Sequence, residues 1–542
     1  MLPSRYWPFA GVLLLTVVFA WALPWSHNAG YGVAAFGTLS LLGLWDLVQR
    51  KHALRRNFPL TARFRYLLES IGPEIRQYFI EADTVELPFS RQQRAIVYQR
   101  AKDVLDKRPF GTQRDLYSDK YEWMNHSLQP AQLTTHDFRI TIGEGRAQPY
   151  SASVFNISAM SFGSLSANAI LALNRGAKQG GFYHDTGEGS ISRHHRVHGG
   201  DLVWEIGSGY FGCRSDDGRF DPDRFAANAR DPQVKMIELK LSQGAKPGQG
   251  GILPAAKVSA EIAEARGVPQ GVECHSPAAH SAFATPIELL QFVDRLRELS
   301  GGKPTGFKLA IGHPWEWFAI AKAMKQTGLL PDFIVVDGGE GGTGAAPLEF
   351  TDHVGAPMRE ALLLVHNTLV GLDLRSKVRI GAAGKIVTAF DMARTLALGA
   401  DWCNSARGFM FSLGCIQSQS CHTDRCPTGV ATQDPSRQAA LDPQDKGTRV
   451  ANFHRNTLLA LRDLLAAAGL RHPAELGPEH IIRRVSSTEV RSLAKLHHFV
   501  PPGQLLEAVP EHPVFQVFWD QARADSFAAP AAAQAMQASK LR

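Results

Sequence analysis

The chain has 542 residues, of which 44% are hydrophobic and 20% are charged, and its formal net charge is +7. A chain of this length can bury one large core with smaller pieces beside it, and the composition is ordinary for a globular protein. The positive excess is small, and no long run of lysine and arginine is interleaved with aromatic residues. The sequence therefore argues against nucleic-acid binding.

The first 50 residues contain two apolar stretches, Tyr6–Trp25 and Tyr31–Trp45. Each approaches the roughly 20 residues that cross a bilayer as a helix. Basic residues follow at 50, 51, 55 and 56, and the positive-inside rule places the chain after them on the cytoplasmic side. We predict a transmembrane hairpin over residues 1–50 in the inner (cytoplasmic) membrane, with the main body facing the cytoplasm. A cleaved signal peptide is the alternative for the first stretch.

Residues 51–147 are polar and mostly helical in pattern, with Arg91–Lys107 as an amphipathic candidate. At the other end, residues 436–542 are predicted to form a helical segment and a tail, with one helix over Arg449–Leu470. These parts carry no recognisable chemistry. We expect them to flank the central domain.

Residues 148–435 alternate apolar strand-like segments with helical stretches, which predicts an α/β fold, a (β/α)8 TIM barrel. The segment Ser190–Pro232 is too long for a simple loop and is expected to cover the barrel mouth. The eight strand candidates are Ala152–Ile157, Phe182–His184, Met236–Leu241, Gly271–Cys274, Gly306–Ile311, Phe333–Val336, Val378–Ile380 and Trp402–Asn404.

Three cysteines stand close together late in the chain, with the spacing C-x5-C-x4-C: Cys415, Cys421 and Cys426. Thiolates bind soft metals, and a close-set group of them is the usual way to hold iron and sulfide. Three thiolates suit a three-iron (3Fe-4S) cluster. A structural zinc site with His422 or Cys403 as a fourth ligand is the alternative, and a disulfide is not expected in a chain with six cysteines and a cytosolic body.

The stretch just upstream, Val378–Gly384, reads as a buried strand that runs into a glycine turn. A helical stretch (Val387–Gly399) and a second short strand (Asp401–Ser405) follow. Repeated strand, glycine turn and helix is how α/β barrels present backbone N–H groups to a phosphate. A phosphate site beside a cysteine cluster suggests a flavin that exchanges electrons with iron–sulfur.

Five motifs in order then carry a family resemblance. They resemble the FMN-binding synthase domain of glutamate synthase over roughly residues 146–435. Each motif alone would be a weak signal, but the ordered set is specific. The motifs are Ser158-Ala-Met-Ser-Phe-Gly163, Gly187-Glu-Gly189, Gln243-Gly-Ala-Lys-Pro-Gly248, Gly341-Gly-Thr-Gly-Ala345 and the cysteine run that ends Cys426-Pro-Thr-Gly-Val-Ala-Thr-Gln433.

The cofactor that this resemblance implies is FMN. Its phosphate is assigned to the late loops of the barrel, where glycines let backbone N–H groups approach and Arg407 adds a charge. Glycines that only make tight turns are the alternative. The end of the first strand would border the flavin ring, and Lys240 and Gln243, near the end of the third, would bond its polar edge. The predicted FMN-binding residues are Ser158, Ala159, Met160, Ser161, Lys240, Gln243, Gly341, Gly342, Thr343, Gly344, Gly381, Gly384 and Arg407.

Two residues, Glu188 and Lys246, resemble the substrate-side residues of the family, the alternative being exposed loop charges. Lys246 would hold a carboxylate of 2-oxoglutarate or its imine, and Glu188 would bind or protonate the imine. After Lys-Pro-Gly the family usually reads Gly-Gly-Gln, whereas this chain reads Gly250-Gly251-Ile252. An isoleucine side chain cannot hydrogen-bond, so one substrate contact is lost.

The resemblance implies reductive amination of 2-oxoglutarate to glutamate, with hydride passing from reduced FMN to 2-iminoglutarate. The chain starts Met1-Leu2, without an amino-terminal cysteine nucleophile. Its Gly-x-Gly-x-x-Gly runs, Gly207–Gly212 and Gly339–Gly344, lie inside the predicted barrel segment, and no separate nicotinamide-binding domain is expected. We therefore expect an external electron donor, such as ferredoxin or a membrane carrier, and ammonia from a separate subunit. The alternatives are an FMN oxidoreductase for another 2-oxo acid or imine and a non-catalytic membrane electron-transfer subunit.

Overall fold

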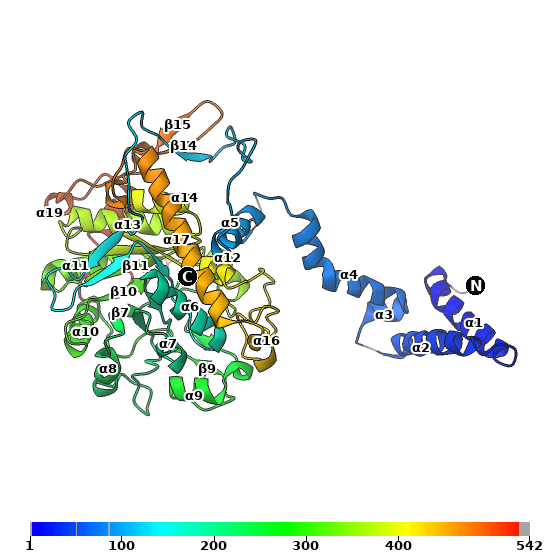
Figure 1. Ribbon diagram of the computed structural model, residues 1–542. Coiled ribbons are helices and arrows are strands. Elements are labelled where there is room, and N and C mark those ends of the chain that lie inside the picture. The colour runs from blue at the N-terminus through cyan, green and yellow to red at the C-terminus, as the bar shows by residue number, and fades with distance from the viewer. Residues whose placement is uncertain (1–2, 50, 85–86, 531–542) are drawn as a thin grey trace, which may run out of the picture. The chain divides into compact units, whose positions relative to one another are not determined.

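The computed structural model describes residues 3–49, 51–84 and 87–530. The chain divides into two compact units, Met1–Arg91 and Gln92–Arg542, called unit 1 and unit 2 below. Unit 1 contains the predicted hairpin and unit 2 the predicted barrel (Figure 1). Arg50, one of the basic residues behind the hairpin prediction, and residues 531–542 of the predicted tail lie outside the described residues.

Unit 1 begins with two apolar helices, α1 (Trp7–Ala22, preceded by the short turn η1, Ser4–Tyr6) and α2 (Ala29–Val48). Ser4–Ala22 and Ala29–Val48 are long and apolar enough to cross a bilayer, and little of either is buried. The helices pack closely, because a Cβ at Gly43 would lie 2.2 Å from the Phe9 ring. Such approach through small residues is typical of membrane helices. The membrane location itself stays a prediction.

The rest of unit 1 is helical: α3 (Ala53–Asn57), α4 (Thr61–Ile75) and the π-helical turn η2 (Arg76–Ile80). An ion pair ties the start of α4 to the end of α2. The side chain of Asp46 on α2 is fully buried, and its carboxylate accepts hydrogen bonds from Arg63 Nε at 2.9 Å and Arg63 Nη2 at 2.8 Å. Leu60 N donates a third bond to it at 3.2 Å.

Unit 2 is built on a closed barrel of eight parallel strands. This confirms the predicted (β/α)8 fold. In chain order the barrel strands are β4 (Phe155–Ile157), β5 (His184–Asp185), β6 (Leu202–Ile206), β7 (Val234–Lys240), β10 (Thr305–Leu309), β11 (Phe333–Asp337), β12 (Arg379–Ala383) and β13 (Trp402–Ser405).

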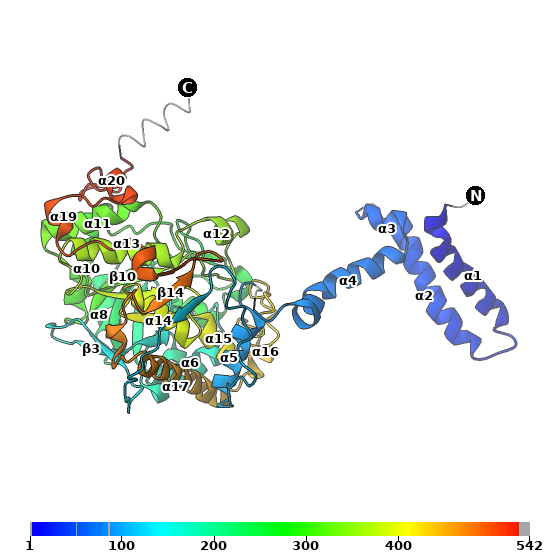
Figure 2. The ribbon, with the colours of Figure 1, turned by 90° about the horizontal axis from the view of Figure 1, so that it is seen from above.

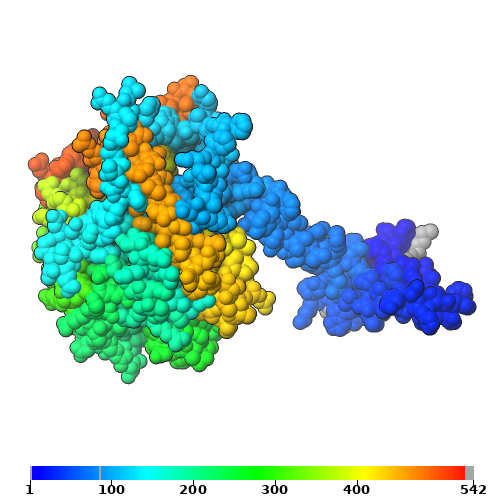
Figure 3. All heavy atoms as spheres, viewed as in Figure 1, coloured from blue at the N-terminus to red at the C-terminus, as the bar shows by residue number. Residues whose placement is uncertain are grey.

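Helices surround the strands and start at local caps, such as the capping box of Thr285 and Glu288. Helix α17 lies along α6, and the end of α5 is bound to it by Asn456 Nδ2, which donates to Arg100 O at 2.9 Å (Figures 1 and 3). The helices are α5 (Arg91–Ala101), α6 (Ala167–Gly180), α7 (Arg193–Arg196), α8 (Pro222–Ala229), η3 (Ala255–Lys257), α9 (Ala260–Arg266), α10 (Pro286–Leu299), α11 (Pro314–Thr327), α12 (Leu348–His353), α13 (Met358–Gly371), α14 (Ala389–Ala397), α15 (Arg407–Ser412), α16 (Pro435–Ala439), α17 (Pro443–Ala467), η4 (Pro473–Glu475), α18 (Leu493–Leu496), α19 (Gln504–Glu507) and α20 (Pro513–Phe518).

Two strand predictions need correction. The segment predicted as a barrel strand at Gly271–Cys274 instead contributes to β9 (Cys274–His275), which pairs antiparallel with β8 (Ile252–Leu253) outside the barrel. The missing barrel strand is β6, inside the segment that was expected to be an insertion over the mouth. Lys240 therefore ends the fourth barrel strand and not the third.

One end of the barrel is closed by an apolar layer. The antiparallel pair β2 (Arg139–Ile142) and β3 (Tyr150–Ser153) contributes to it, so the predicted strand Ala152–Ile157 is divided between β3 and β4. The members from the barrel strands lie within the first three residues of their strands or just before them, which leaves the carboxyl ends for a site. The layer comprises Ile142, Tyr150, Ala152, Tyr183, Val203, Met236, Phe333, Val335 and Trp402.

The helical prediction for residues 51–147 holds only as far as Ala101. The described residues 102–147 contain β1 (Glu122–Met124) and β2 and no helix. β1 pairs with β14 (Ile481–Arg484), which pairs in turn with β15 (Val490–Ser492). This small sheet joins both flanks of the barrel domain, an arrangement that local sequence pattern cannot reveal because its partners are far apart in the chain.

Candidate functional site

Two predicted site residues meet at the carboxyl end of the barrel. Lys240 Nζ lies 3.0 Å from Glu188 Oε2, and the two side chains are only 9% and 16% exposed. The Glu188 carboxylate is enclosed, because a Cβ at Gly251 would lie 2.1 Å from Oε1 and one at Gly207 would lie 2.8 Å from Oε2. The Glu188 carboxylate is therefore fixed in position at the barrel mouth and is not an exposed loop charge.

The third charged side chain at this mouth, Lys246, is 2% exposed. Its Nζ has no hydrogen-bond partner within the described residues. Burial lowers the pKa of Lys246; the Glu188 carboxylate opposes that shift and Lys240 adds to it. For Glu188, burial raises the pKa, but the ion pair with Lys240 and the charges of Arg266 and Lys246 outweigh it, so the net pKa is lowered. The site thus holds an ionised carboxylate and a buried ammonium that lacks an acceptor.

A small pocket opens above the ion pair. The predicted ring-edge residue Gln243 lines it, and Gln243 O accepts a hydrogen bond from Lys246 N at 3.4 Å. Ile252 is not part of the lining; it pairs with His275 in the β8–β9 ribbon. The pocket is lined by Glu188, Ser208, Lys240, Leu241, Ser242, Gln243, Gly248, Gln249, Gly250, Gly251, Pro277 and Ala278.

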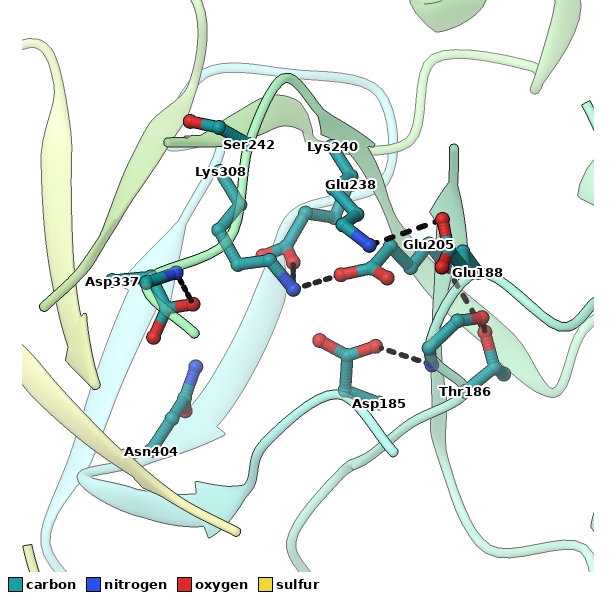
Figure 4. Close-up of polar contacts among 12 residues, drawn as sticks. Asp185, Thr186, Glu188, Glu205, Glu238, Lys240, Ser242, Lys308, Asp337 and Asn404 are labelled. Carbon is teal, nitrogen blue, oxygen red and sulfur yellow. Dashed lines mark hydrogen bonds and ion pairs between the residues drawn. The ribbon is translucent and has the colours of Figure 1, made fainter. Parts of the chain in front are cut away.

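Inside the barrel lies a polar cluster that the sequence did not reveal (Figure 4). Lys308 contacts Glu205 and lies 3.4 Å from Glu238 Oε1, with all three side chains buried. Asp185, Glu205 and Glu238 are close enough to hold a metal ion, the one such group in the described chain. Lys308 already supplies a cation there. The signal in the sequence is a charged residue inside a largely apolar strand, as in Leu202-Val-Trp-Glu-Ile206.

The buried surroundings of this cluster favour the protonated form of its carboxyl groups. Burial raises the pKa of Asp185 to about 7; Glu205 adds to the shift, while Lys308 and a hydrogen bond from Gly187 N oppose it. The pKa of Glu238 is also raised well above its ordinary value, first by burial and then by the neighbouring carboxylates. At least one carboxyl of the cluster therefore carries a proton near neutral pH.

The glycine loops lie against one another. A Cβ at Gly244 would lie 1.8 Å from Gly338 O, and Gly244 N donates to Asp337 Oδ2 at 2.8 Å. Arg407, at the start of α15, donates from Nη2 to Gly342 O at 3.1 Å. The structure thus brings together the predicted phosphate loop Gly341–Gly344, which includes Thr343, and the predicted phosphate arginine.

The other two predicted phosphate glycines behave differently. Gly381 lies within β12 and not on a loop, and a Cβ there would meet the Trp402 ring at 2.5 Å, so its small size serves barrel packing; its contact with a phosphate stays a prediction. Gly384 does follow β12, but a Cβ there would meet Met358 at 2.7 Å. The Glu340 carboxylate accepts from Met358 N at 2.9 Å and occupies that end of α13.

The segment after the first barrel strand reaches the same mouth. Ser158 N donates to Ser405 O at 3.1 Å, which joins the ends of β4 and β13. A Cβ at Gly187 would lie 2.6 Å from Ser161 N, so Ser158–Ser161, with Ala159 and the buried Met160 between them, lies beside the loop that carries Glu188. These residues therefore lie at the end of the first barrel strand, and their contact with a flavin stays a prediction.

The three clustered cysteines follow α15 on one loop that is bound to the rest of unit 2. Tyr98 Oη donates to Cys415 O at 2.7 Å, and Lys257 Nζ donates to Cys421 O at 3.0 Å. A Cβ at Gly344 would lie 3.2 Å from Cys421, so the cysteine loop touches the predicted phosphate loop. Backbone N–H groups of Ala431, Thr428 and Val430 point at Cys426, as suits a sulfur that carries negative charge.

The spacing of the cysteines bears on the zinc alternative. In the described residues, Cys415, Cys421 and Cys426 do not all come within 4.8 Å of one another through Sγ. A single tetrahedral zinc ion with bonds of about 2.3 Å requires tighter spacing, whereas a cluster can bind each thiolate to a different iron. Cys403 is buried in β13 and is bonded to Val154 through its backbone, away from this loop.

The family described as "Conserved region in glutamate synthase" matches residues 106–471. This chain belongs to that family. It is 38% identical over 497 residues to the glutamate synthase large subunit-like protein YerD of Bacillus subtilis, a match that covers 84% of this chain and 94% of that one. It is 35% identical over 349 residues to the archaeal-type glutamate synthase (NADPH) of Thermotoga maritima, covering 64% of this chain and 65% of that one. The chain is therefore an oxidoreductase of the glutamate synthase type.

Solved structures resemble the chain only loosely. The crystal structure of mandelate oxidase with (S)-2-phenylpropionate overlaps it with a TM-score of 0.41 at 16% identity, covering 74% of this chain and 98% of that one. That overlap is too weak to support a functional argument.

Proposed function

We propose that the chain binds FMN and a three-iron cluster and reduces 2-iminoglutarate, formed from 2-oxoglutarate and ammonia, to glutamate. The observation that carries the proposal is the buried Lys246 ammonium, which lacks an acceptor in the described structure and lies beside the Glu188–Lys240 pair. A buried unpaired charge is unfavourable unless a ligand neutralises it. A substrate carboxylate would satisfy it.

Glu188 supplies the second half of substrate recognition. Because its pKa is lowered, it is an anion near neutral pH and accepts hydrogen bonds rather than giving a proton. An anion at this position favours the protonated imine, whose carbon accepts hydride more readily than that of the neutral imine. Lys240 holds the Glu188 carboxylate in place through the 3.0 Å ion pair.

The FMN phosphate would be held by Gly341, Gly342, Gly344 and Arg407. The fit rests on the glycine loop, where backbone can approach a ligand closely, and on the Arg407 guanidinium already bonded to Gly342 O. Ser158–Ser161 and Lys240 stand at the same mouth, as a ring site requires. Reduced FMN would supply the hydride to the imine carbon.

Cys415, Cys421 and Cys426 would hold the cluster. The support is the thiol donor set on one loop, the N–H groups that face Cys426, and the contact of this loop with the glycine loop. The cluster would relay single electrons from an external donor, a ferredoxin or a membrane carrier, to the flavin. Ammonia would come from a separate subunit.

We also propose that α1 and α2 form a transmembrane hairpin in the cytoplasmic membrane. The support is their length, their hydropathy and their exposure. A core helix of a soluble protein would be mostly buried, whereas Trp21 and Leu41 are 72% and 70% exposed. The basic residues that follow favour a cytoplasmic position for unit 2.

The test is an anaerobic experiment on the purified full chain in detergent. The protein should release FMN and not FAD on denaturation, and its oxidised form should show the low-temperature paramagnetic signal of a three-iron cluster, lost in Cys421→Ser. The reduced flavin should be reoxidised by 2-oxoglutarate with ammonium. Protein that is colourless and takes up no FMN, or contains stoichiometric zinc and no iron, contradicts the cofactor assignment.

Another 2-oxo acid or imine is the second candidate substrate, because this chain has Ile252 where the family usually has a glutamine. If the reduced flavin is not reoxidised by 2-oxoglutarate and ammonium but is reoxidised by another 2-oxo acid, the enzyme acts on that acid. Ile252 directly follows the lining residues Gly250 and Gly251, and Ile252→Gln should raise activity toward 2-oxoglutarate if the longer side chain, which is usual in the family, reaches the pocket. If no 2-oxo acid or imine reoxidises the flavin, the electron-transfer alternative replaces both.

A further inference from the structure

Helix α4 carries an exposed apolar face along its whole length. Phe64, Leu67, Leu68, Ile71 and Ile75 follow one another at positions i, i+3, i+4, i+7 and i+11, which places them on one side of a helix. Their exposure ranges from 63% at Phe64 to 37% at Ile75. The turn η2 extends the apolar surface with Tyr78, Phe79 and Ile80, exposed by 56%, 84% and 70%.

Within unit 1, α4 runs away from the α1–α2 pair (Figures 1 and 2). Its apolar side chains stay exposed among the described residues. The opposite side of the helix is polar, with Arg65 paired to Glu69 at 2.8 Å. A helix with one apolar and one charged side needs a boundary between an apolar and an aqueous phase, or a partner with an apolar groove. Two features of unit 1 favour the first.

The first feature is the Asp46–Arg63 pair. It joins the last turns of an apolar helix to the first turn of α4 by two hydrogen bonds under 3 Å, with the carboxylate fully buried. If α2 spans the membrane, its end lies at the lipid headgroups, and this pair holds the start of α4 at the same depth. The second feature is charge: residues 51–80 contain six basic and two acidic side chains, which suits a surface of anionic headgroups.

We infer that α4 and η2 lie in the cytoplasmic surface of the bilayer, with the Phe64–Ile75 face among the acyl chains and the basic residues toward anionic phospholipid headgroups. The inference rests on the proposed transmembrane hairpin for its geometry. It adds a lipid-binding surface that is separate from the active site. It also makes the apolar face of α4 a fixed part of the membrane anchor rather than a linker.

The test uses the full chain in vesicles of phosphatidylcholine with phosphatidylglycerol, with the photo-crosslinker p-benzoylphenylalanine in place of Leu67 or Ile71. Ser70, on the polar side of α4, is the matched control position, and Leu14 in α1 reports on the hairpin. After irradiation, mass spectrometry identifies what each position has bound. Leu67 and Ile71 should give phospholipid adducts several-fold more often than Ser70, and less often in vesicles without phosphatidylglycerol.

Adducts of position 67 with peptides of unit 2, with a second copy of the chain, or with no partner at all would overturn the inference. Lipid adducts that are equally frequent at positions 67 and 70 would overturn it too. The hairpin proposal fails separately if position 14 gives no lipid adduct. In that case, lipid adducts at position 67 would still support a surface helix.

Discussion

Lys240 and Lys246 share one carboxylate, Glu188, at the mouth of the barrel. The 3.0 Å ion pair assigns that carboxylate to Lys240, so the Lys246 ammonium remains without an acceptor in the described chain. Removing a charge from water without a partner is unfavourable, and this imbalance gives the site a physical preference for an anionic ligand. Glu188 in turn prefers a ligand that carries positive charge or N–H groups close to the anion.

Lys246→Met tests this preference, because it keeps much of the side-chain volume and removes the charge. Loss of a charge-assisted contact costs about 1.5–3 kcal/mol, or roughly ten- to a hundredfold in affinity. The Kd of 2-oxoglutarate for the oxidised protein should rise by that factor while FMN stays bound. An unchanged Kd would mean that the carboxylate is held elsewhere.

The same lysine predicts a pH dependence. Burial lowers the pKa of Lys246 below its ordinary value, so its charge is complete at low pH and is lost as pH rises through the lowered pKa. Affinity for 2-oxoglutarate should therefore fall as pH rises, and the fall should begin at a lower pH than it would for a lysine with an ordinary pKa. Lys246→Arg should shift the fall to higher pH, since a guanidinium stays charged. Calorimetric titrations across the pH range measure both curves.

The barrel cluster predicts a pH effect on stability. Because the folded pKa of Asp185 is raised to about 7 and the unfolded value is about 4, the folded protein loses stability as pH rises between these values. Asp185→Asn removes that loss, and Asn can still accept the hydrogen bond from Gly187 N. The Tm of the variant minus the Tm of the wild type should therefore increase between about pH 5 and about pH 8. Asp137→Asn, at an exposed position, is the control for a change from Asp to Asn outside the cluster.

Site residues at strand ends and on glycine-rich loops could be predicted from the sequence, and those in the middle of strands could not. Glu188, Lys246 and Arg407 follow strand ends in recognisable motifs, and the structure places all three around one mouth. Glu205 and Lys308 stand singly within apolar strands, where local pattern does not show which face points inward. Their partners come from other strands, so the cluster exists only once the barrel is closed.

At the scale of elements, the misassigned strands show what periodicity misses. β6 was hidden because Glu205 interrupts its apolar run, although the side chain is buried against Lys308. The segment Gly271–Cys274 is predicted as a barrel strand because a short extended segment looks the same in sequence whether it joins the barrel or pairs with β8 outside it. A parallel strand that is buried on both faces is apolar throughout, and this continuous pattern does not indicate which strand pairs with it.

The short element η3 anchors the cysteine loop through Lys257, whose Nζ donates to Cys421 O at 3.0 Å and to Ala431 O at 3.2 Å. Lys257→Met should leave two backbone carbonyls without that donor and loosen the loop. We expect less iron per protein after anaerobic purification and faster bleaching by a chelator, with the flavin content unchanged. Lys178→Met, at an exposed position on α6, is the matched control and should retain its iron. Equal iron retention in both variants would show that Lys257 does not anchor the site.

At the scale of the whole molecule, unit 1 and unit 2 each have their own internal contacts. The two units differ in how far they expose their large apolar side chains. Unit 2 buries most of its large apolar side chains in the barrel and between barrel and helices, although some, such as Phe110 and Leu128, are exposed. Unit 1 exposes its large apolar side chains on α1, α2 and α4, which is unfavourable in water and favourable in lipid. This contrast supports the proposal that unit 2 carries out the chemistry and unit 1 makes the membrane contact.

Three truncations test this division. Residues 92–542 should fold, stay in the supernatant with phosphatidylglycerol vesicles, and keep the flavin, because the barrel core and the predicted FMN loops lie within unit 2. Residues 51–542 retain α4 without the hairpin and should be soluble alone but sediment with those vesicles. The same fragment with Leu67→Ser and Ile71→Ser should stay in the supernatant, since two apolar anchors are replaced on the face that would enter the lipid. If residues 92–542 sediment as well, a membrane-binding surface lies on the barrel domain, and the separation between the two units fails.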